Sequence, residues 1–193
     1  MQKNQPKTAF EEKCNALSHL LAFGLFTLLG FTSPDITSST YSVIFATMFF
    51  SSFLYHSETR WKVFFRNVDM FFIYVVIGAT GLLVPQALDP YHAILIVGVL
   101  FLSGVHHLIR GVFGIPEGYA VPVLYLVNGL IAAYVILCSD PHHTGALWLS
   151  LVTYLVGFAF YVNDHIKYFH TGWHVACSGG AYFMHCHLVN NLL

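Results

Sequence analysis

Seven long apolar runs dominate this sequence and limit the folds that it can adopt. They lie at about residues 15–32, 39–57, 68–86, 92–110, 120–138, 145–163 and 169–190. The hydrocarbon core of a bilayer requires about 20 apolar residues of helix, in which the backbone polar groups bond to one another. The sequence therefore predicts an all-α bundle of seven transmembrane helices. We expect one membrane domain over residues 1–193, with a short polar segment at 1–13.

The scarcity of charged residues agrees with this prediction. Only 9% of the 193 residues are charged and 56% are hydrophobic, whereas an ordinary soluble domain carries roughly 25% charged residues. The 8 Lys and Arg residues are balanced by 9 Asp and Glu residues. The chain therefore lacks the basic excess that binding to nucleic acid requires. We expect a multi-pass integral membrane protein with no nucleic-acid partner.

The basic residues also predict how the chain is oriented. If successive helices alternate in direction, all 8 basic residues fall on one side of the membrane. They precede the first helix, follow the second, end the fourth and precede the seventh: Lys3, Lys7, Lys13, Arg60, Lys62, Arg66, Arg110 and Lys167. Loops rich in Lys and Arg face the cytoplasm. The N-terminus is therefore predicted inside and the C-terminus outside.

Four ionisable residues lie at the predicted cytoplasmic ends of three helices: His56, Asp69, His170 and His174. His170 and His174 are four residues apart, so both imidazoles project from one helix face and can share an ion. His56 would complete a set of three histidine ligands. Three protein ligands with an open fourth position are typical of catalytic zinc. The alternative is a set of separate polar side chains that reach the lipid headgroups.

Further residues are predicted to act beside such an ion. Asp69 is placed to bind it through water, to move a proton or to orient a ligand histidine. Ser52, one turn before His56, is placed to stabilise an oxyanion or else to bond back to its own helix. A group at the start of the first helix is predicted to support the ligands or face the substrate: Glu12, Asn15, Ser18 and His19. Capping and helix–helix hydrogen bonding are the alternative roles.

Motifs spread along nearly the whole chain resemble the hemolysin III family. They are the SxxxH of Ser52 to His56, the acid at Asp69, the HxxxH of His170 to His174, and residues 11–19 (EEKCNALSH), which resemble that family's first-helix motif. The family belongs with the progestin and adipoQ receptors and the alkaline ceramidases in one superfamily of seven-span proteins. The resemblance implies one Zn²⁺ held by the three histidines, with Ser52 and Asp69 close by. It also implies a bacterial inner (plasma) membrane location.

Three functions follow as expectations. The first is a zinc-dependent hydrolase that acts on an amide or ester of a membrane lipid at the cytoplasmic side. The second is a receptor-like sensor that holds structural zinc, binds a membrane lipid as ligand and regulates the state of the membrane without catalysis. The third is a transporter or channel, which needs a polar route across the bilayer. Outside the cytoplasmic group the sequence offers only scattered polar residues for such a route, such as Asn128.

Overall fold

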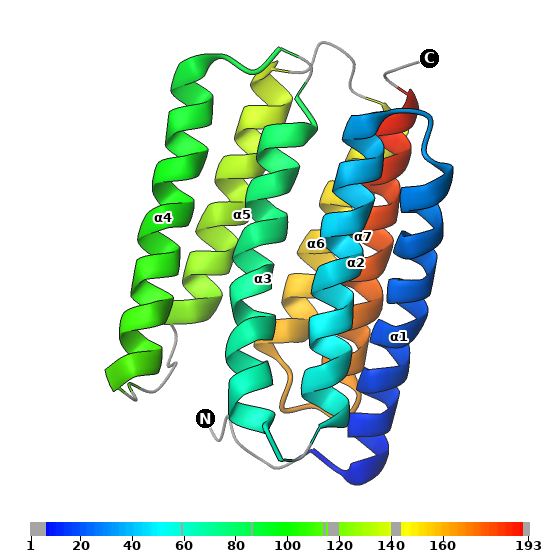
Figure 1. Ribbon diagram of the computed structural model, residues 1–193, viewed down its shortest axis with the longest axis vertical. Coiled ribbons are helices and arrows are strands. Elements are labelled where there is room, and N and C mark those ends of the chain that lie inside the picture. Colours follow the sequence, from blue (N-terminus) through cyan, green and yellow to red (C-terminus); the bar gives the residue numbers. More distant parts are fainter. Residues whose placement is uncertain are drawn as a thin grey trace. The chain divides into compact units, whose positions relative to one another are not determined.

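The computed structural model describes residues 7–58, 60–85, 87–113, 115, 120–139 and 144–190, and within them the chain forms seven α-helices and no β-strand (Figure 1). The helices are α1 (Ala9–Thr32), α2 (Ile36–Ser57), α3 (Lys62–Leu83), α4 (Pro90–Phe113), α5 (Ala120–Ser139), α6 (Gly145–Val162) and α7 (Phe169–Asn190). The all-α prediction is confirmed, and each helix overlaps one predicted range. Lys3 and the rest of the first six residues lie outside the described part.

Local capping determines where the first two helices begin. Thr8 and Glu11 form a capping box, in which the Thr8 Oγ1 accepts from the Glu11 amide at 3.2 Å and a Glu11 carboxylate oxygen accepts from the Thr8 amide at 2.9 Å. Asp35 caps α2 by accepting from the amides of Thr37 and Ser38. The capping box starts α1 at Ala9 rather than near residue 15, so the polar residues that follow Thr8 are helical.

Five of the described helices, α1, α3, α4, α5 and α6, are long and apolar enough to cross a membrane. They indicate a multi-pass membrane protein. The other two, α2 and α7, carry more polar residues, and many of these are buried inside the protein. The buried polar residues are Ser38, Ser42, Ser51, Ser52 and His56 in α2, and His174, His185 and His187 in α7.

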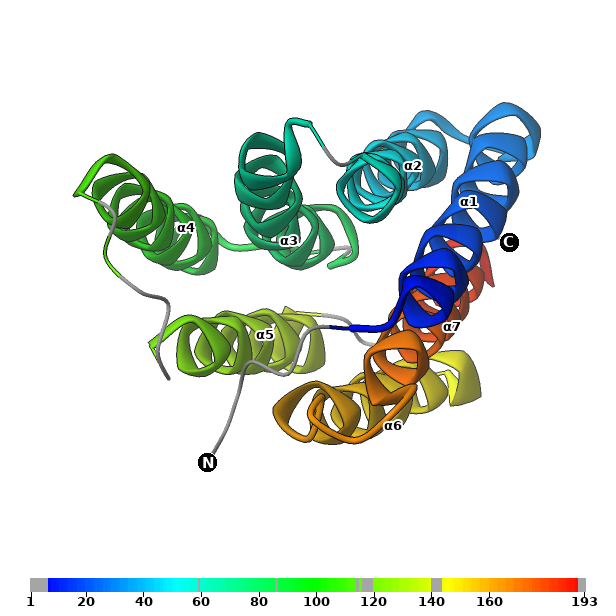
Figure 2. The ribbon, with the colours of Figure 1, turned by 90° about the horizontal axis from the view of Figure 1, so that it is seen from below.

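The chain divides into two compact units. The first contains residues 1–66 and 144–193, and the second contains residues 67–143. In the first unit α1 packs beside α2, α6 packs beside α7, and α7 also contacts α1 and α2 (Figures 1 and 2). A Cβ atom added at Gly157 of α6 would lie 2.9 Å from the Cβ of Ala176. This glycine therefore allows α6 and α7 to approach closely.

The second unit contains most of α3 together with α4 and α5. A Cβ atom added at Gly81 of α3 would lie 2.7 Å from the Ile96 side chain of α4 and 3.4 Å from the Ala132 side chain of α5. The Tyr125 hydroxyl of α5 donates to the Met70 carbonyl of α3 at 3.2 Å. Close backbone approach and interhelical hydrogen bonding both stabilise this unit.

Buried aromatic rings fill the middle of the first unit. Phe26 of α1 lies against Phe45 and Phe49 of α2, with ring centroids 5.5 and 5.3 Å apart. The row continues to Tyr41, 4.6 Å from Phe45. His19 lies 5.9 Å from Phe49 at one end of the row, and His185 lies 6.4 Å from Tyr41 at the other. The core of this unit therefore separates two groups of polar residues.

Candidate metal centre

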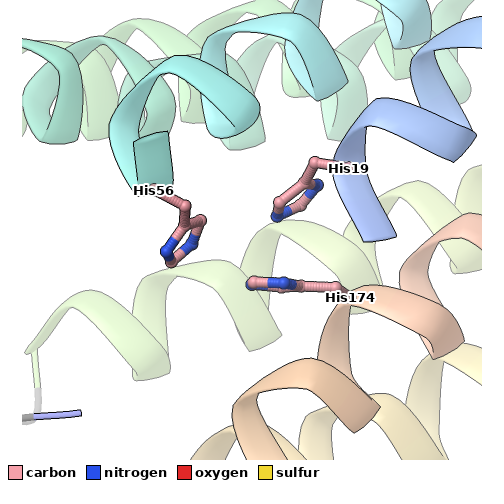
Figure 3. A group of neighbouring side chains, drawn as sticks. All are labelled: His19, His56 and His174. Carbon is pink, nitrogen blue, oxygen red and sulfur yellow. The ribbon is translucent and has the colours of Figure 1, made fainter. Parts of the chain in front are cut away.

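Three buried imidazoles from three helices meet at one end of the first unit. His19 of α1, His56 of α2 and His174 of α7 each offer a ring nitrogen, and these atoms lie within 4.8 Å of one another. Figure 3 shows the three rings extending toward a common space. The ring centroids are 3.9 Å apart for His19 and His174, 5.0 Å for His56 and His174, and 5.6 Å for His19 and His56.

The helix directions explain this meeting. A short connection after α1 sends α2 back along it, so the last turn of α2, which contains His56, returns to the start of α1 (Figure 1). The first turns of α7 lie at the same end. There the Thr171 hydroxyl donates to Oδ1 of Asn15 in α1 at 2.6 Å. Residues far apart in the sequence are thereby brought to one depth.

His56 is oriented by a carboxylate. Its Nδ1 lies 2.7 Å from Oε2 of Glu12, and the other oxygen of Glu12 accepts from Lys62 at 3.2 Å. A carboxylate is an acceptor, so the imidazole donates from Nδ1 and keeps a lone pair on Nε2. That Nε2 is buried and has no hydrogen-bond partner among the described residues. A histidine held by a carboxylate with its other nitrogen free is the usual arrangement of a metal ligand.

His174 has a similar arrangement. Its Nδ1 lies 3.3 Å from the Ser18 hydroxyl, which itself donates to the Asn15 carbonyl at 2.8 Å. Because the single hydroxyl proton of Ser18 is used in that bond, its oxygen accepts from Nδ1 of His174 and leaves the lone pair on Nε2. Nδ1 of His19 is also buried without a hydrogen-bond partner in the described part of the chain.

His170, predicted as a ligand, lies beside this group of three. Its ring centroid is 4.5 Å from that of His174 and 5.5 Å from that of His56. Its side chain is 20% exposed, compared with 3% for His56. The structure thus brings the predicted trio of His56, His170 and His174 together, but places His19, predicted as a supporting residue, in the tighter group. The role of His170 as a ligand stays a prediction.

The other predicted site residues have different surroundings. Asn15 is buried, and its Nδ2 has no hydrogen-bond partner within the described ranges. Ser52 is buried one turn before His56, and its hydroxyl donates to the sulfur of Met48 at 3.7 Å. Asp69 lies in α3 within the second compact unit. Its proposed proton transfer stays a prediction.

The sequence predicts no role for Lys62 or Thr171, and only an indirect one for Ser18 and His19. A signal for the first-helix residues was present, because positions 12, 15 and 19 recur at the spacing of one helix face. No such signal exists for Lys62 or Thr171. Their contacts join helices that are remote in the sequence, so they become visible only in the folded chain.

The donors at this site fit a divalent metal ion. Neutral imidazoles suit zinc, copper, iron and nickel, and three histidines with an open position are a known catalytic zinc set. Comparison with protein-family models, with curated proteins and with solved structures finds no match to this chain. The resemblance drawn from the motifs therefore stays a prediction, and the functional argument depends on the geometry of the three imidazoles.

Proposed function

We propose that this chain is a zinc-dependent integral membrane hydrolase that cleaves an amide or ester bond in a lipid. The observation that carries the proposal is the buried group of His19, His56 and His174, with ligand atoms within 4.8 Å of one another. A buried polar nitrogen without a partner costs free energy, and a cation bound by all three rings would offset that cost. The motifs that resemble a superfamily containing lipid amidases support the choice of substrate.

In this proposal all seven helices cross the membrane and the N-terminus faces the cytoplasm. Because the polar residues of α2 and α7 are largely buried against other helices, the residues left facing lipid are mainly apolar, such as Val43 and Phe50. The segregation of Lys and Arg supports the orientation. The three imidazoles would then lie near the cytoplasmic headgroups, where a lipid carbonyl can reach them. The proposed location is a bacterial plasma membrane.

The side chains of this proposed centre have separate roles. His19, His56 and His174 would hold the ion. Glu12 accepts the Nδ1 proton of His56, so the lone pair on Nε2 of His56 stays available to the ion. Ser18 does the same for His174. A bound zinc ion supplies Lewis-acid activation of water and of a carbonyl group.

The remaining polar groups would bind the substrate and move protons. The Nδ2 of Asn15 is a buried donor suited to a substrate oxygen, because Oδ1 of the same amide is held by Thr171. Ser52 is proposed to donate to the developing oxyanion, whereas proton transfer by Asp69 stays a prediction from the sequence alone.

The test uses purified protein in mixed micelles with a long-chain N-acyl lipid and, separately, a phospholipid ester. Release of fatty acid is measured by mass spectrometry for the zinc-loaded wild type, for His174→Ala, and for His185→Ala as a control from the far end of α7. We expect turnover of at least one lipid in the wild type and the control, and none in His174→Ala. Equal turnover by the metal-free protein would refute the proposal.

A sensor is the second candidate, and one observation favours it. His170 provides a fourth imidazole 4.5 Å from the His174 ring, and four protein ligands make a closed, structural zinc site. X-ray absorption spectroscopy of the zinc-loaded protein separates the two functions by the number of nitrogen ligands. We expect three imidazole nitrogens and one exchangeable position; four imidazole nitrogens would favour the sensor.

A further inference from the structure

One basic side chain is buried in the second unit. Arg110 of α4 is 7% exposed, and it is the only buried Lys or Arg among the described residues. The other basic residues that the structure describes are exposed, apart from Lys7 and Lys62, which each lie beside an acid. A buried charge is costly unless it is paired and hydrogen-bonded. The surroundings of Arg110 therefore decide what this residue does.

The contacts of Arg110 leave most of its hydrogen-bond donors unused. Its Nη2 donates to the Ile115 carbonyl at 3.1 Å, and no acid in the described part of the chain forms an ion pair with it. A guanidinium has five N–H donors in a planar fork. An arginine in the last turn of a helix commonly bonds to carbonyls at that end, but this role uses one donor alone. The others are suited to an anion.

A second unused nitrogen lies one turn earlier on the same helix. His106 is four residues before Arg110, so the two side chains project from one face of α4. Nδ1 of His106 is buried and has no hydrogen-bond partner within the described ranges. A neutral imidazole can carry its proton on Nδ1 and donate from that atom. One helix face thus offers donors from two side chains to a single acceptor.

The next residue, His107, fixes this part of α4 against α3. Its Nε2 donates to the Asn67 carbonyl at 3.1 Å. Asn67 lies in α3 and belongs to the same compact unit as α4. An interhelical hydrogen bond of this kind limits the rotation of α4 about its axis. His106 and Arg110 are therefore presented together rather than on a freely turning helix.

We propose that Arg110 and His106 form a binding site for a phosphate group carried by an anionic phospholipid. The inference goes beyond the proposed hydrolase and does not depend on its metal centre. A guanidinium fits phosphate oxygens through two parallel hydrogen bonds, and basic pockets between transmembrane helices bind lipid headgroups. Ile109 and Phe113, in the last turns of α4, are exposed and offer an apolar surface to acyl chains. They favour a lipid over a free phosphate ion.

The experiment measures lipid binding to the purified chain in detergent by native mass spectrometry. The probes are dioleoyl phosphatidylglycerol and dioleoylglycerol, which lacks the phosphate, with inorganic phosphate as a competitor. The matched control for Arg110→Gln is Arg66→Gln, which removes an equal charge from an exposed position. We expect Arg110→Gln to bind phosphatidylglycerol about 10–100-fold more weakly than the wild type, and His106→Ala about fivefold more weakly. The control should bind as the wild type does.

Two results would overturn the phosphate site. Equal affinity of the wild type and Arg110→Gln would show that the guanidinium binds no lipid, and equal binding of dioleoylglycerol would show that the phosphate is not recognised. Displacement of the lipid by inorganic phosphate would instead identify a soluble ion as the ligand.

Circular dichroism checks that each variant keeps its helices. If Arg110→Gln does not fold, Arg110→Lys replaces it, because lysine keeps the charge but cannot form the forked pair. We expect this variant to bind phosphatidylglycerol about tenfold more weakly than the wild type. Wild-type affinity in both Arg110→Lys and His106→Ala would refute the site.

Discussion

Buried histidines at the two ends of the first unit differ in whether their ring nitrogens have hydrogen-bond partners. At the far end, Nδ1 of His185 lies 3.1 Å from the Ser42 hydroxyl, and Nδ1 of His187 lies 2.8 Å from the Thr144 hydroxyl. At the near end, His19, His56 and His174 face one another, and two of them have a buried nitrogen without a partner among the described residues. The same helix, α7, contributes histidines to both ends.

The difference distinguishes histidines whose ring nitrogens have partners within the protein from the histidines that we propose as metal ligands. A buried imidazole that meets a hydroxyl is satisfied within the protein, and its hydrogen bond adds about 1 kcal/mol to stability. A buried nitrogen left without a partner costs about 1–3 kcal/mol. The near end places two such nitrogens close together, which supports the proposed cation, whereas hydroxyl groups satisfy the corresponding nitrogens at the far end.

The largest expected effect comes from removing one imidazole at each end. Zinc at 100 times its Kd should stabilise the wild type by about 2.7 kcal/mol, and His174→Ala should lose this stabilisation. His185→Ala should keep it, although the metal-free variant will be less stable because Ser42 loses its partner. Unfolding in mixed detergent micelles with and without zinc measures both effects. Equal responses of the two variants would erase the distinction between the ends.

The next effect tests the carboxylate that orients His56. Glu12→Gln should weaken zinc binding by about 10–100-fold, because a neutral amide oxygen replaces the charged acceptor that fixes the ring of His56. Glu11→Gln is the matched control: its carboxylate bonds to Thr8 and Tyr168 rather than to a histidine. Competition with a fluorescent chelator gives the affinities. Wild-type affinity in Glu12→Gln would show that the contact is only structural.

A third change should affect stability and leave the metal untouched. The Thr144 hydroxyl accepts from the Leu147 amide as the N-cap of α6 and also contacts His187. Thr144→Val should therefore lower the free energy of unfolding by about 2 kcal/mol. Thr153→Val, on the same helix, removes only a bond to the Leu149 carbonyl and should have little effect. Altered zinc affinity in Thr144→Val would contradict a purely structural far end.

The smallest effect concerns pH and Asp35, the cap of α2. Burial raises the pKa of its carboxyl, but hydrogen bonds from Ser38 and Thr37 lower it by more, so the pKa lies below its usual value. The ionised cap therefore contributes stability above about pH 4, which is lost as the pH falls through the lowered pKa.

The variant Asp35→Asn keeps a good capping side chain but does not titrate. We expect its stability to fall less than that of the wild type between pH 7 and pH 3, by about 0.5–1 kcal/mol. Denaturant titrations at the two pH values, with Asp89→Asn as a control in another connection, measure the difference. If Asp35→Asn and the wild type showed the same pH dependence, the Asp35 carboxylate would make no pH-dependent contribution to stability.

The helices were predictable because each apolar run is long enough to need internal hydrogen bonding in a membrane. The helix boundaries were less predictable. Helix α3 begins at Lys62 rather than near residue 68, because Lys62 and Arg66 favour helix although their low hydropathy excludes them from an apolar run. The common depth of His56 and His174 also followed from alternating helix directions. The sequence could not show whether His19 or His170 joins the tighter group with His56 and His174. That depends on how each helix is rotated about its axis, which close contacts such as that at Gly157 determine.

The phenyl rings of Phe26, Phe45 and Phe49 have a consequence for how the proposed hydrolase would work in an energised membrane. They lie between the two polar ends of the first unit and carry no group that accepts or donates a proton. Water and ions at the near end thus meet an insulating layer inside this unit. The proposed hydrolysis at the near end would then proceed without dissipating the voltage across the membrane.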